Sequence, residues 1–300
     1  MPRHTTLRRR AGALLGAALL AGAARAEPAP TPAPACAICA EWNAPQKPFQ
    51  IYGNTYYVGV KGISSVLITS PSGHVLIDGA LAESAPLIAA NIRALGLRPE
   101  DIKLILNSHA HSDHAGGIAE LQRVSGAPVM ASASAALVLA AGQAGPDDPQ
   151  YGSMSPFAPV TDMRLVHDRE TVTSGTLEVT AHFTPGHTPG GTSWSWKSCE
   201  GKTCANLVFG DSLRAMARDG FKFSSAEDYP NALQDFERSF TTFAALPCDI
   251  LLTAHPDPEL LDKLSKPHVA GKKTPFEPDA CRKYAASARA SLAKRLTSER

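Results

Sequence analysis

The sequence predicts an α/β domain in which two β-sheets pack face to face and helices cover both outer surfaces. Strand-like stretches followed by helical segments occur in the first half of the chain, and the same order returns in the second half. The stretch from position 36 to position 300 is long enough for one large domain, and no second shift in composition marks a boundary. We therefore expect a single domain over residues 36–300.

The N-terminal region predicts export. A basic start that ends in Arg8-Arg9-Arg10 precedes an apolar run over residues 11–24, and Ala24-Arg25-Ala26 offers a small-residue cleavage site. The run is shorter than the roughly twenty residues that a membrane-spanning helix needs. We predict that residues 1–26 are a signal peptide and that the mature protein is periplasmic or secreted, without membrane insertion. The arginines also suit twin-arginine export, so the export route stays open.

The elements of the first half follow from hydrophobic periodicity and turn residues. Residues 27–35 are rich in Ala, Pro and Thr, and we expect an extended tether there. The predicted strands are 55–60, 64–69, 74–78, 102–106 and 129–130, and the predicted helices are 84–95, 115–124 and 132–141. Residues 145–159 are rich in Gly, Pro and Asp and predict a loop, which at this length commonly has a functional role.

The second half repeats the pattern. The predicted strands are 177–183, 192–196, 206–209 and 249–253, and the predicted helices are 232–246 and 279–296. We expect the loops 145–159 and 219–231 to line a substrate groove, but loop sequences of this kind do not predict a conformation.

All six cysteines follow the predicted signal peptide, and an even number in an exported protein favours disulfides. Cys199 and Cys204 flank a short loop, and Cys248 could fasten the C-terminal segment through Cys281, which leaves Cys36 with Cys39. The Cys36-x-x-Cys39 spacing also suits a redox motif or half of a structural zinc site. A structural disulfide is the favoured interpretation of this pair, with free or intermolecular thiols next.

The charges exclude some partners. The formal net charge is +1, with 29 basic and 28 acidic residues, and beyond the N-terminal region the basic residues are scattered. The sequence therefore predicts neither a nucleic-acid groove nor a polybasic membrane patch, and a small neutral or anionic substrate remains open.

The strongest chemical signal is the segment His109-Ala110-His111-Ser112-Asp113-His114, between a core strand and a helix. In an extended backbone His109, His111 and Asp113 point to one side, and the turn into the helix brings His114 round. Imidazoles that leave one position for water suit zinc, and a carboxylate beside imidazoles suits a second, more oxygen-rich site. The alternative is a polar loop whose histidines merely cap a helix, but four ligand-type residues in six favour metal binding.

Further candidate ligands follow other strands. His187 lies in Thr184-Pro185-Gly186-His187-Thr188-Pro189-Gly190-Gly191, and His255 lies in Ala254-His255-Pro256. Either histidine alone is more often a turn residue than a ligand, but together with the first segment they complete a set for two metals. Asp211 and Ser212 also come after a strand, where a Gly-Asp-Ser turn is equally compatible with turn chemistry. We assign no role to His4, His74, His167, His182 or His268.

The order of these motifs resembles that of the metallo-β-lactamase superfamily, and the particular residues within them resemble those of its subclass B3. The likeness covers nearly all of the mature chain and includes Tyr52-Gly53-Asn54-Thr55-Tyr56-Tyr57-Val58-Gly59, Thr188-Pro189-Gly190-Gly191-Thr192-Ser193-Trp194-Ser195-Trp196 and the loop between Cys199 and Cys204. The resemblance implies a four-layer αββα sandwich with two zinc ions per chain at one rim of the sheets.

The resemblance also implies roles for individual residues. His109, His111 and His187 would hold the first zinc, and Asp113, His114 and His255 the second. Ser212 stands where this subclass has a serine in place of a thiol ligand, and that serine is thought to hold a zinc-bound water. Asp211 is ambiguous, because glyoxalase II thioesterases bridge their metals with an Asp from a similar turn; we expect it outside the direct ligands here. Arg214 departs from the Ser or Thr usual in the subclass.

The implied function is zinc-dependent hydrolysis of the β-lactam amide bond by a zinc-held hydroxide, since zinc lowers the pKa of bound water to about 7. Asp113 would help to move a proton, and Arg214 would pair with the substrate carboxylate. The nearest alternatives are a thioesterase or lactonase on the same scaffold and a non-catalytic zinc-binding protein. We expect a monomer, and the order of preference among penicillins, cephalosporins and carbapenems is not predictable from the sequence.

Overall fold

Two β-sheets make up the centre of the computed structural model, which describes residues 1–2, 36–266 and 276–300. One sheet has seven strands in chain order: β1 (Phe49–Tyr52), β2 (Thr55–Tyr57), β3 (Val66–Ile68), β4 (His74–Ile77), β5 (Ile102–Leu106), β6 (Val129–Ala131) and β7 (Met163–Leu165). The other has five, in the order β12 (Ile250–Thr253), β11 (Thr203–Gly210), β10 (Thr192–Glu200), β9 (Leu177–Phe183) and β8 (Thr171–Ser174). The expected signal peptide, 1–26, and tether, 27–35, lie outside the described residues apart from the first two.

The central strands, such as β3 and β4, are buried on both faces, in line with their nearly continuous apolar sequences. In β4, Val75 and Ile77 face the core between the sheets, whereas Leu76 packs on the opposite side against helices. In β11, Phe209 faces the core between the sheets and Val208 faces away from it. Both surfaces of each sheet are therefore covered, which gives a layered sandwich.

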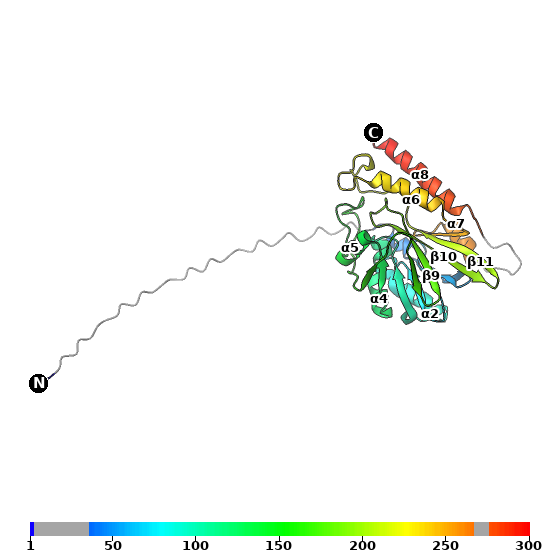
Figure 1. The fold of residues 1–300 in the computed structure, drawn as a ribbon, viewed down its shortest axis with the longest axis horizontal. Coiled ribbons are helices and arrows are strands. Elements are labelled where there is room, and N and C mark those ends of the chain that lie inside the picture. The colour runs from blue at the N-terminus through cyan, green and yellow to red at the C-terminus, as the bar shows by residue number, and fades with distance from the viewer. Residues whose placement is uncertain (3–35, 267–275) are drawn as a thin grey trace. The chain divides into compact units, whose positions relative to one another are not determined.

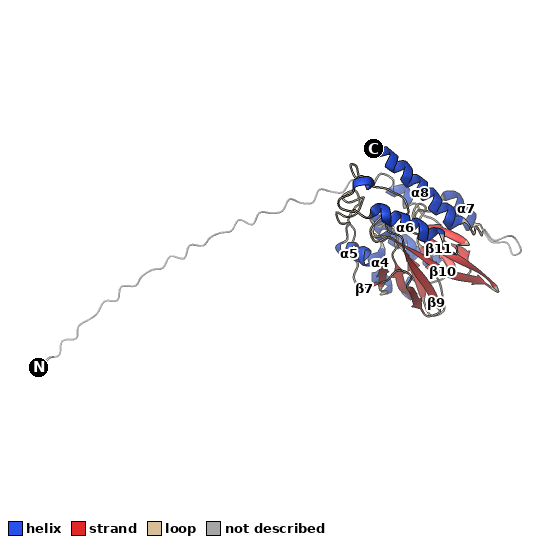
Figure 2. Ribbon diagram, turned by 45° about the horizontal axis from the view of Figure 1, so that its top comes forward, coloured by secondary structure: helices blue, strands red, loops and turns tan. Residues whose placement is uncertain are grey.

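The outer layers are helical (Figures 1 and 2). The seven-stranded sheet is covered by α2 (Ala85–Ala94), α4 (Ile118–Ser125) and α5 (Ala133–Ala141). On the five-stranded sheet, α6 (Ala232–Ala244) lies beside α8 (Ala280–Ser298). The expected αββα architecture is confirmed. Within the described residues, no helix has both the length and the apolar character needed to cross a membrane.

The strand directions bring distant loops to one rim. β4 runs parallel to β5, and β11 runs parallel to β12, so each pair delivers two loops at its carboxyl end. β9 and β11 are both antiparallel to β10, so β9 ends at the same side of its sheet as β11. The loops that follow these five strands carry every candidate ligand, and this topology explains how segments 150 residues apart can meet.

Some boundaries differ from the sequence predictions. The helix expected over 115–124 is two helices, α3 (Ser112–Ala115) and α4, joined through Gly116 and Gly117. A β-carbon on Gly117 would collide with the carbonyl oxygen of Gly79, so the glycines allow this turn to pack against the loop after β4. The short helices α1 (Cys39–Trp42) and α7 (Pro258–Ser265) and the strands β1, β7 and β8 were not predicted.

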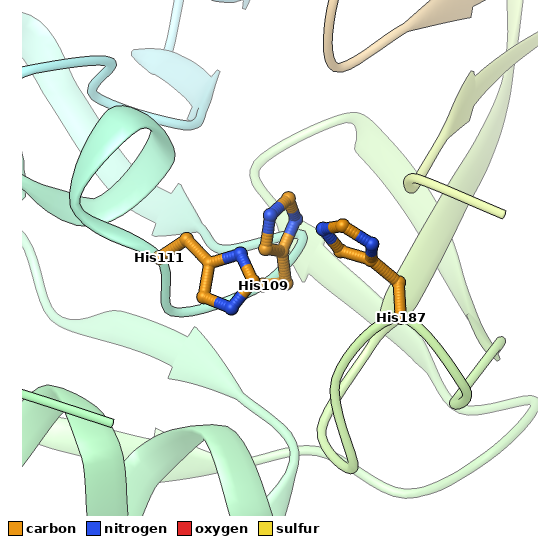
Figure 3. Close-up of side chains that lie close together, drawn as sticks. All are labelled: His109, His111 and His187. Carbon is orange, nitrogen blue, oxygen red and sulfur yellow. The ribbon is translucent and has the colours of Figure 1, made fainter. Parts of the chain in front are cut away.

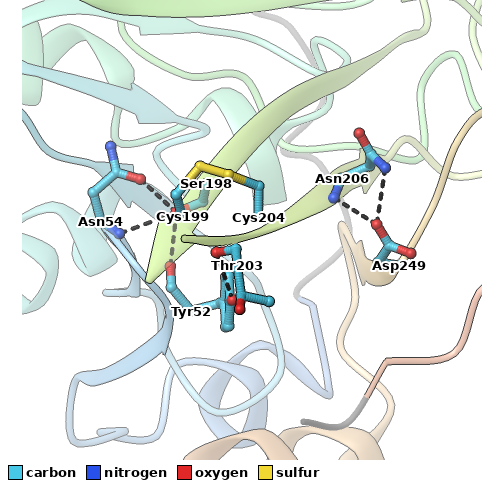
Figure 4. Close-up of a disulfide and its surroundings, with 8 residues drawn as sticks. All are labelled: Tyr52, Asn54, Ser198, Cys199, Thr203, Cys204, Asn206 and Asp249. Atoms are coloured by element: carbon cyan, nitrogen blue, oxygen red, sulfur yellow. Dashed lines mark hydrogen bonds between the residues drawn. A yellow bond between two sulfur atoms is a disulfide. The ribbon is translucent and has the colours of Figure 1, made fainter. Parts of the chain in front are cut away.

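Three disulfides link the cysteines in the expected pairs, Cys36 with Cys39, Cys199 with Cys204, and Cys248 with Cys281. Cys199 and Cys204 face each other across β10 and β11, next to the loop that joins these strands (Figure 4). The Tyr52 hydroxyl donates to the Thr203 carbonyl at 3.0 Å, which ties β1 to the same hairpin. The Cys248–Cys281 bridge anchors α8 beside β12.

The two longer-range bridges should differ in their contribution to stability, because a disulfide that closes a longer loop restricts the unfolded chain more strongly. Cys248 and Cys281 are 33 residues apart, whereas Cys199 and Cys204 are 5 apart. Replacing the first pair by serine should lower the free energy of unfolding by about 4 kcal/mol, and replacing the second by about 2 kcal/mol. Guanidinium denaturation without reductant measures both, and equal losses would contradict the prediction.

Candidate metal centre

The loop after β5 is held in shape by a buried carboxylate. Asp78, in the left-handed region with φ of 60°, accepts from the backbone N–H of Ser108 at 2.7 Å and from the Ser108 hydroxyl. The Asn107 side chain donates to the His109 carbonyl at 2.7 Å. His111 then adopts the extended conformation that precedes α3, so that Asp113 and His114 lie on the first turn of this helix. The backbone therefore turns all the ligand-type side chains of this segment toward the rim.

The first group consists of His109, His111 and His187, whose rings surround a common point (Figure 3). Their ring centroids are 4.8 to 5.0 Å apart, and all three side chains are buried. His109 and His111 come from the loop after β5, and His187 comes from the loop after β9. Each sheet thus contributes to this group.

One nitrogen of each imidazole in this group is engaged on the outer side. His109 Nδ1 lies 2.7 Å from an oxygen of Asp211, and His111 Nε2 lies 3.0 Å from an oxygen of Asp148. His187 Nδ1 donates to the Arg214 carbonyl at 2.8 Å. A neutral imidazole that donates through one nitrogen offers a lone pair at the other, which is the usual arrangement of metal-binding histidines.

The inner nitrogens are available for a ligand. His109 Nε2 is buried and has no hydrogen-bond partner. The Gln150 amide nitrogen lies 3.5 Å from His111 Nδ1 and 3.4 Å from His187 Nε2. Three imidazole lone pairs facing one another fit a zinc ion that keeps a fourth position open.

The second group consists of Asp113, His114 and His255. Asp113 Oδ2 lies 3.4 Å from His114 Nε2 and 3.2 Å from His255 Nε2, and the two nitrogens are 3.2 Å apart. Ligand atoms placed tetrahedrally at the usual zinc distance are about 3.3 Å apart, so this triangle has the right size. His255 Nδ1 donates to the Gly62 carbonyl at 2.9 Å, which leaves the lone pair of Nε2 directed inward.

The electrostatics also fit a bound cation. Burial, reinforced by His114, lowers the pKa of His109 well below its usual value, and burial lowers the pKa of His187 to about 3, so these imidazoles are neutral at physiological pH. Burial acts to raise the pKa of Asp113, but the neighbouring His114 and His255 outweigh it and hold that pKa well below its usual range. Among the described residues, Asp113 and Asp211 form ion pairs with histidines and with no lysine or arginine.

The remaining predicted site residues lie at the same place. A cavity of about 1040 Å³ is lined by His111, Asp113, His187, Ser212, Arg214 and His255. Apolar side chains, among them Trp42, Phe157 and Met216, complete its wall, and the Trp42 ring lies 4.7 Å from that of His255. Arg214 is exposed. The structure therefore brings the sequence-predicted site residues together, and His109, His114 and Asp211 are buried beside the lining residues without lining the cavity themselves.

Sequence reasoning missed three supporting residues, Asp78, Asp148 and Gln150. Asp148 and Gln150 belong to the loop 145–159, whose unusual length was the one available signal. Asp78 is the last residue of a predicted strand, but no motif distinguishes it.

Comparison with known proteins agrees with this geometry. The family model described as the metallo-beta-lactamase superfamily matches residues 58–199, which include the first four ligand candidates and His187. The solved structure of Rm3 metallo-beta-lactamase is 58% identical, with a TM-score of 0.85, and the alignment covers 89% of this chain and 99% of that one. MEM-A1, a subclass B3 metallo-beta-lactamase from a soil metagenome library, is 52% identical with a TM-score of 0.83, covering 86% and 98% of the two chains.

Curated relatives are more distant. A hydroxyacylglutathione hydrolase of Anaeromyxobacter dehalogenans is 30% identical over 147 residues, which are 49% of this chain and 44% of the relative. An N-acyl homoserine lactonase of Azorhizobium caulinodans is 34% identical over 74 residues. The chain spans less than half the length of these curated relatives.

The fold, the paired ligand groups and the near-complete match to Rm3 define the class of this protein: the chain belongs to the metallo-β-lactamase superfamily. Within it, the chain falls among the subclass B3 metallo-β-lactamases, with identities of 44% to 58% to Rm3, MEM-A1 and SMB-1.

The contact between Asp211 and His109 yields a prediction about metal affinity. Replacing Asp211→Asn removes the carboxyl group that lies 2.7 Å from His109 Nδ1 while keeping its shape, and outer partners of this kind usually contribute 10- to 100-fold to metal affinity. We expect zinc affinity to fall by about 10-fold, measured by competition with a chromophoric chelator. Ser193→Ala, in a neighbouring buried position that contacts the Asp211 backbone, serves as control. Unchanged affinity in Asp211→Asn would show that the carboxylate does not support the site.

Proposed function

We propose that this protein hydrolyses the amide bond of β-lactam antibiotics, with one zinc ion in each of the two ligand groups. The observation that carries the proposal is the pair of adjacent ligand sets, His109 with His111 and His187, and Asp113 with His114 and His255, each of which contributes two residues to the wall of one cavity. The high identity to structures named metallo-beta-lactamases supports the choice of substrate.

Zinc, when bound, supplies a Lewis acid for the carbonyl oxygen and makes hydroxide available near neutral pH. The chain's own residues supply orientation and proton transfer. Asp113 Oδ2 belongs to the second ligand triangle, whereas Asp113 Oδ1 is buried without a hydrogen-bond partner in this structure. Asp113 can therefore serve as ligand through one oxygen and hold a proton on the other. Ser212, on the cavity wall, offers a hydroxyl that can orient a water molecule.

The cavity wall explains how a β-lactam would be held. Arg214 lies on the wall and is exposed, and a guanidinium binds a carboxylate through two parallel hydrogen bonds. The apolar side chains of Trp42, Phe157 and Met216 can cover the non-reacting part of the substrate and exclude water. The position of Asp211, on the outer side of His109, supports a role in orienting that ligand instead of bridging two metals.

The compartment and assembly form part of the same proposal. The basic and apolar N-terminal sequence supports a signal peptide over 1–26 and a periplasmic or secreted enzyme. The three disulfides of the described residues suit an oxidising compartment. We propose a monomer that acts on a small molecule.

The activity proposal predicts chelator-sensitive turnover. Purified residues 27–300 should hydrolyse nitrocefin and a carbapenem in a spectrophotometric assay, and a zinc chelator should abolish both activities because the ligands alone provide no nucleophile. His255→Ala should lower zinc content and activity together. Hydrolysis of S-lactoylglutathione or an acyl-homoserine lactone, with no β-lactam turnover, would instead favour the thioesterase or lactonase alternative. Full zinc binding without any acyl hydrolysis would favour a non-catalytic zinc protein.

A second prediction concerns Arg214. Its backbone carbonyl accepts from His187, and Arg214→Ala keeps this contact while it removes the guanidinium from the cavity wall. We expect KM to rise about 10-fold, as for the loss of a charged hydrogen bond, with a much smaller change in kcat. Steady-state kinetics on a β-lactam with a free carboxylate measure both constants, and an unchanged KM would rule out the carboxylate contact.

A further inference from the structure

Arg218 joins the two loops that border the first ligand group. Its backbone N–H donates to the Pro149 carbonyl at 2.8 Å, and its guanidinium Nη1 donates to the Asp148 carbonyl at 2.9 Å. The guanidinium carbon lies 5.8 Å from the Tyr151 ring centroid and 5.2 Å from that of Phe221. One side chain thus contacts the loop 145–159 and the loop after β11 at the same time.

The turn that Arg218 holds carries a direct partner of a ligand. Both oxygens of Asp148 lie within 3.1 Å of His111 Nε2, and one of them also accepts from the Gln150 N–H at 2.7 Å. Asp148 is only 3% exposed, so its side chain has little freedom to move once its backbone is placed. The Asp148 carbonyl accepts from Tyr151 N at 3.0 Å as well as from Arg218.

The same segment also fixes a second ligand. Four residues before Arg218, the Arg214 carbonyl accepts from His187 Nδ1 at 2.8 Å. The segment 214–218 therefore orients two of the three histidines of the first group from outside, one through its carbonyl and one through the Asp148 turn. In the described structure, neither His255 nor Gly62, whose carbonyl accepts from His255, makes a hydrogen bond with this segment.

We infer that Arg218 is a positioning residue for the first ligand group, His109 with His111 and His187, and not for the second. Its side chain is 26% exposed and pairs with Asp228 at 3.4 Å, but it also donates to the neutral Asp148 carbonyl, so a positive charge alone does not account for its contacts. The planar guanidinium is suited to donate in its plane while its faces lie against aromatic rings, which a lysine cannot reproduce. This inference rests on the proposed zinc binding.

The test separates the two groups by removing one ligand at a time. The His255→Ala variant leaves only the first group complete, and the His187→Ala variant leaves only the second. Zinc affinity is then measured by chelator competition in each background with and without Arg218→Ala. Arg289→Ala is the matched control, because Arg289 also lies 5.3 Å from an aromatic centroid and pairs with a carboxylate, but these partners, Phe240 and Glu237, are on α6 and not on the loop 145–159.

We expect Arg218→Ala to lower zinc affinity about 10-fold in the His255→Ala background and by less than about 2-fold in the His187→Ala background. Arg218→Lys should restore only part of the loss, since it keeps a donor but not the planar stacking, and Arg289→Ala should change neither affinity. Equal losses in both backgrounds, or none in the His255→Ala background, would overturn the inference. Full restoration by lysine would also overturn it.

One further readout and one further outcome of the affinity measurement separate the possible explanations. Thermal unfolding of the metal-free variants detects a general loss of stability, which would lower both affinities and contradict a role confined to the first group. If neither the His255→Ala variant nor the His187→Ala variant binds zinc with Arg218 intact, the proposed zinc function itself fails, and this inference fails with it.

Discussion

The constraint on which this structure depends is the burial of acidic side chains that have only histidines as ion-pair partners. Asp113 and Asp211 are nearly inaccessible to solvent, and burial lowers the pKa of His109 and of His114 beside them. Buried carboxylates without a compensating charge are costly, so the arrangement makes physical sense around cations. The loops, the strand directions and the outer hydrogen bonds all serve to keep these groups close together in spite of that cost.

The imidazoles of the first group are also oriented by partners on the side that faces away from the other two rings. Each histidine of the first group has an outer partner: the Asp211 carboxyl and the Arg214 carbonyl from the loop after β11, and the Asp148 carboxylate from the loop 145–159. Because these two loops are far apart in the sequence, the geometry of the site is a property of the whole rim and not of one motif. Arg218 adds to this support indirectly, because it holds the backbone of Asp148, whose carboxylate contacts His111.

The sequence predicted the fold class and the candidate ligands that the structure brings together, because both leave periodic or clustered signals. The strands 102–106 and 177–183 coincide with β5 and β9, since one is apolar apart from Lys103 and the other alternates. β7 and β8 escaped prediction because they are short, polar and at the sheet edges, where a hydrophobic pattern is weak. The helix α7 had a usable signal, because Asp257 caps it directly before Pro258. Asp148 had only the length of its loop, and Arg218 had no signal, since their roles depend on neighbours that only the folded chain provides.

Each ligand group also draws on both sheets: His111 with His187 in one, Asp113 with His255 in the other. A metal ion bound to such a group is therefore a cross-link between the two halves of the sandwich. A ligand present at a thousand times its dissociation constant stabilises the folded state by about 4 kcal/mol, so metal supply in the surrounding compartment would help to set how long the protein survives there. Depletion of zinc would therefore shorten the lifetime of this protein as well as abolish its activity.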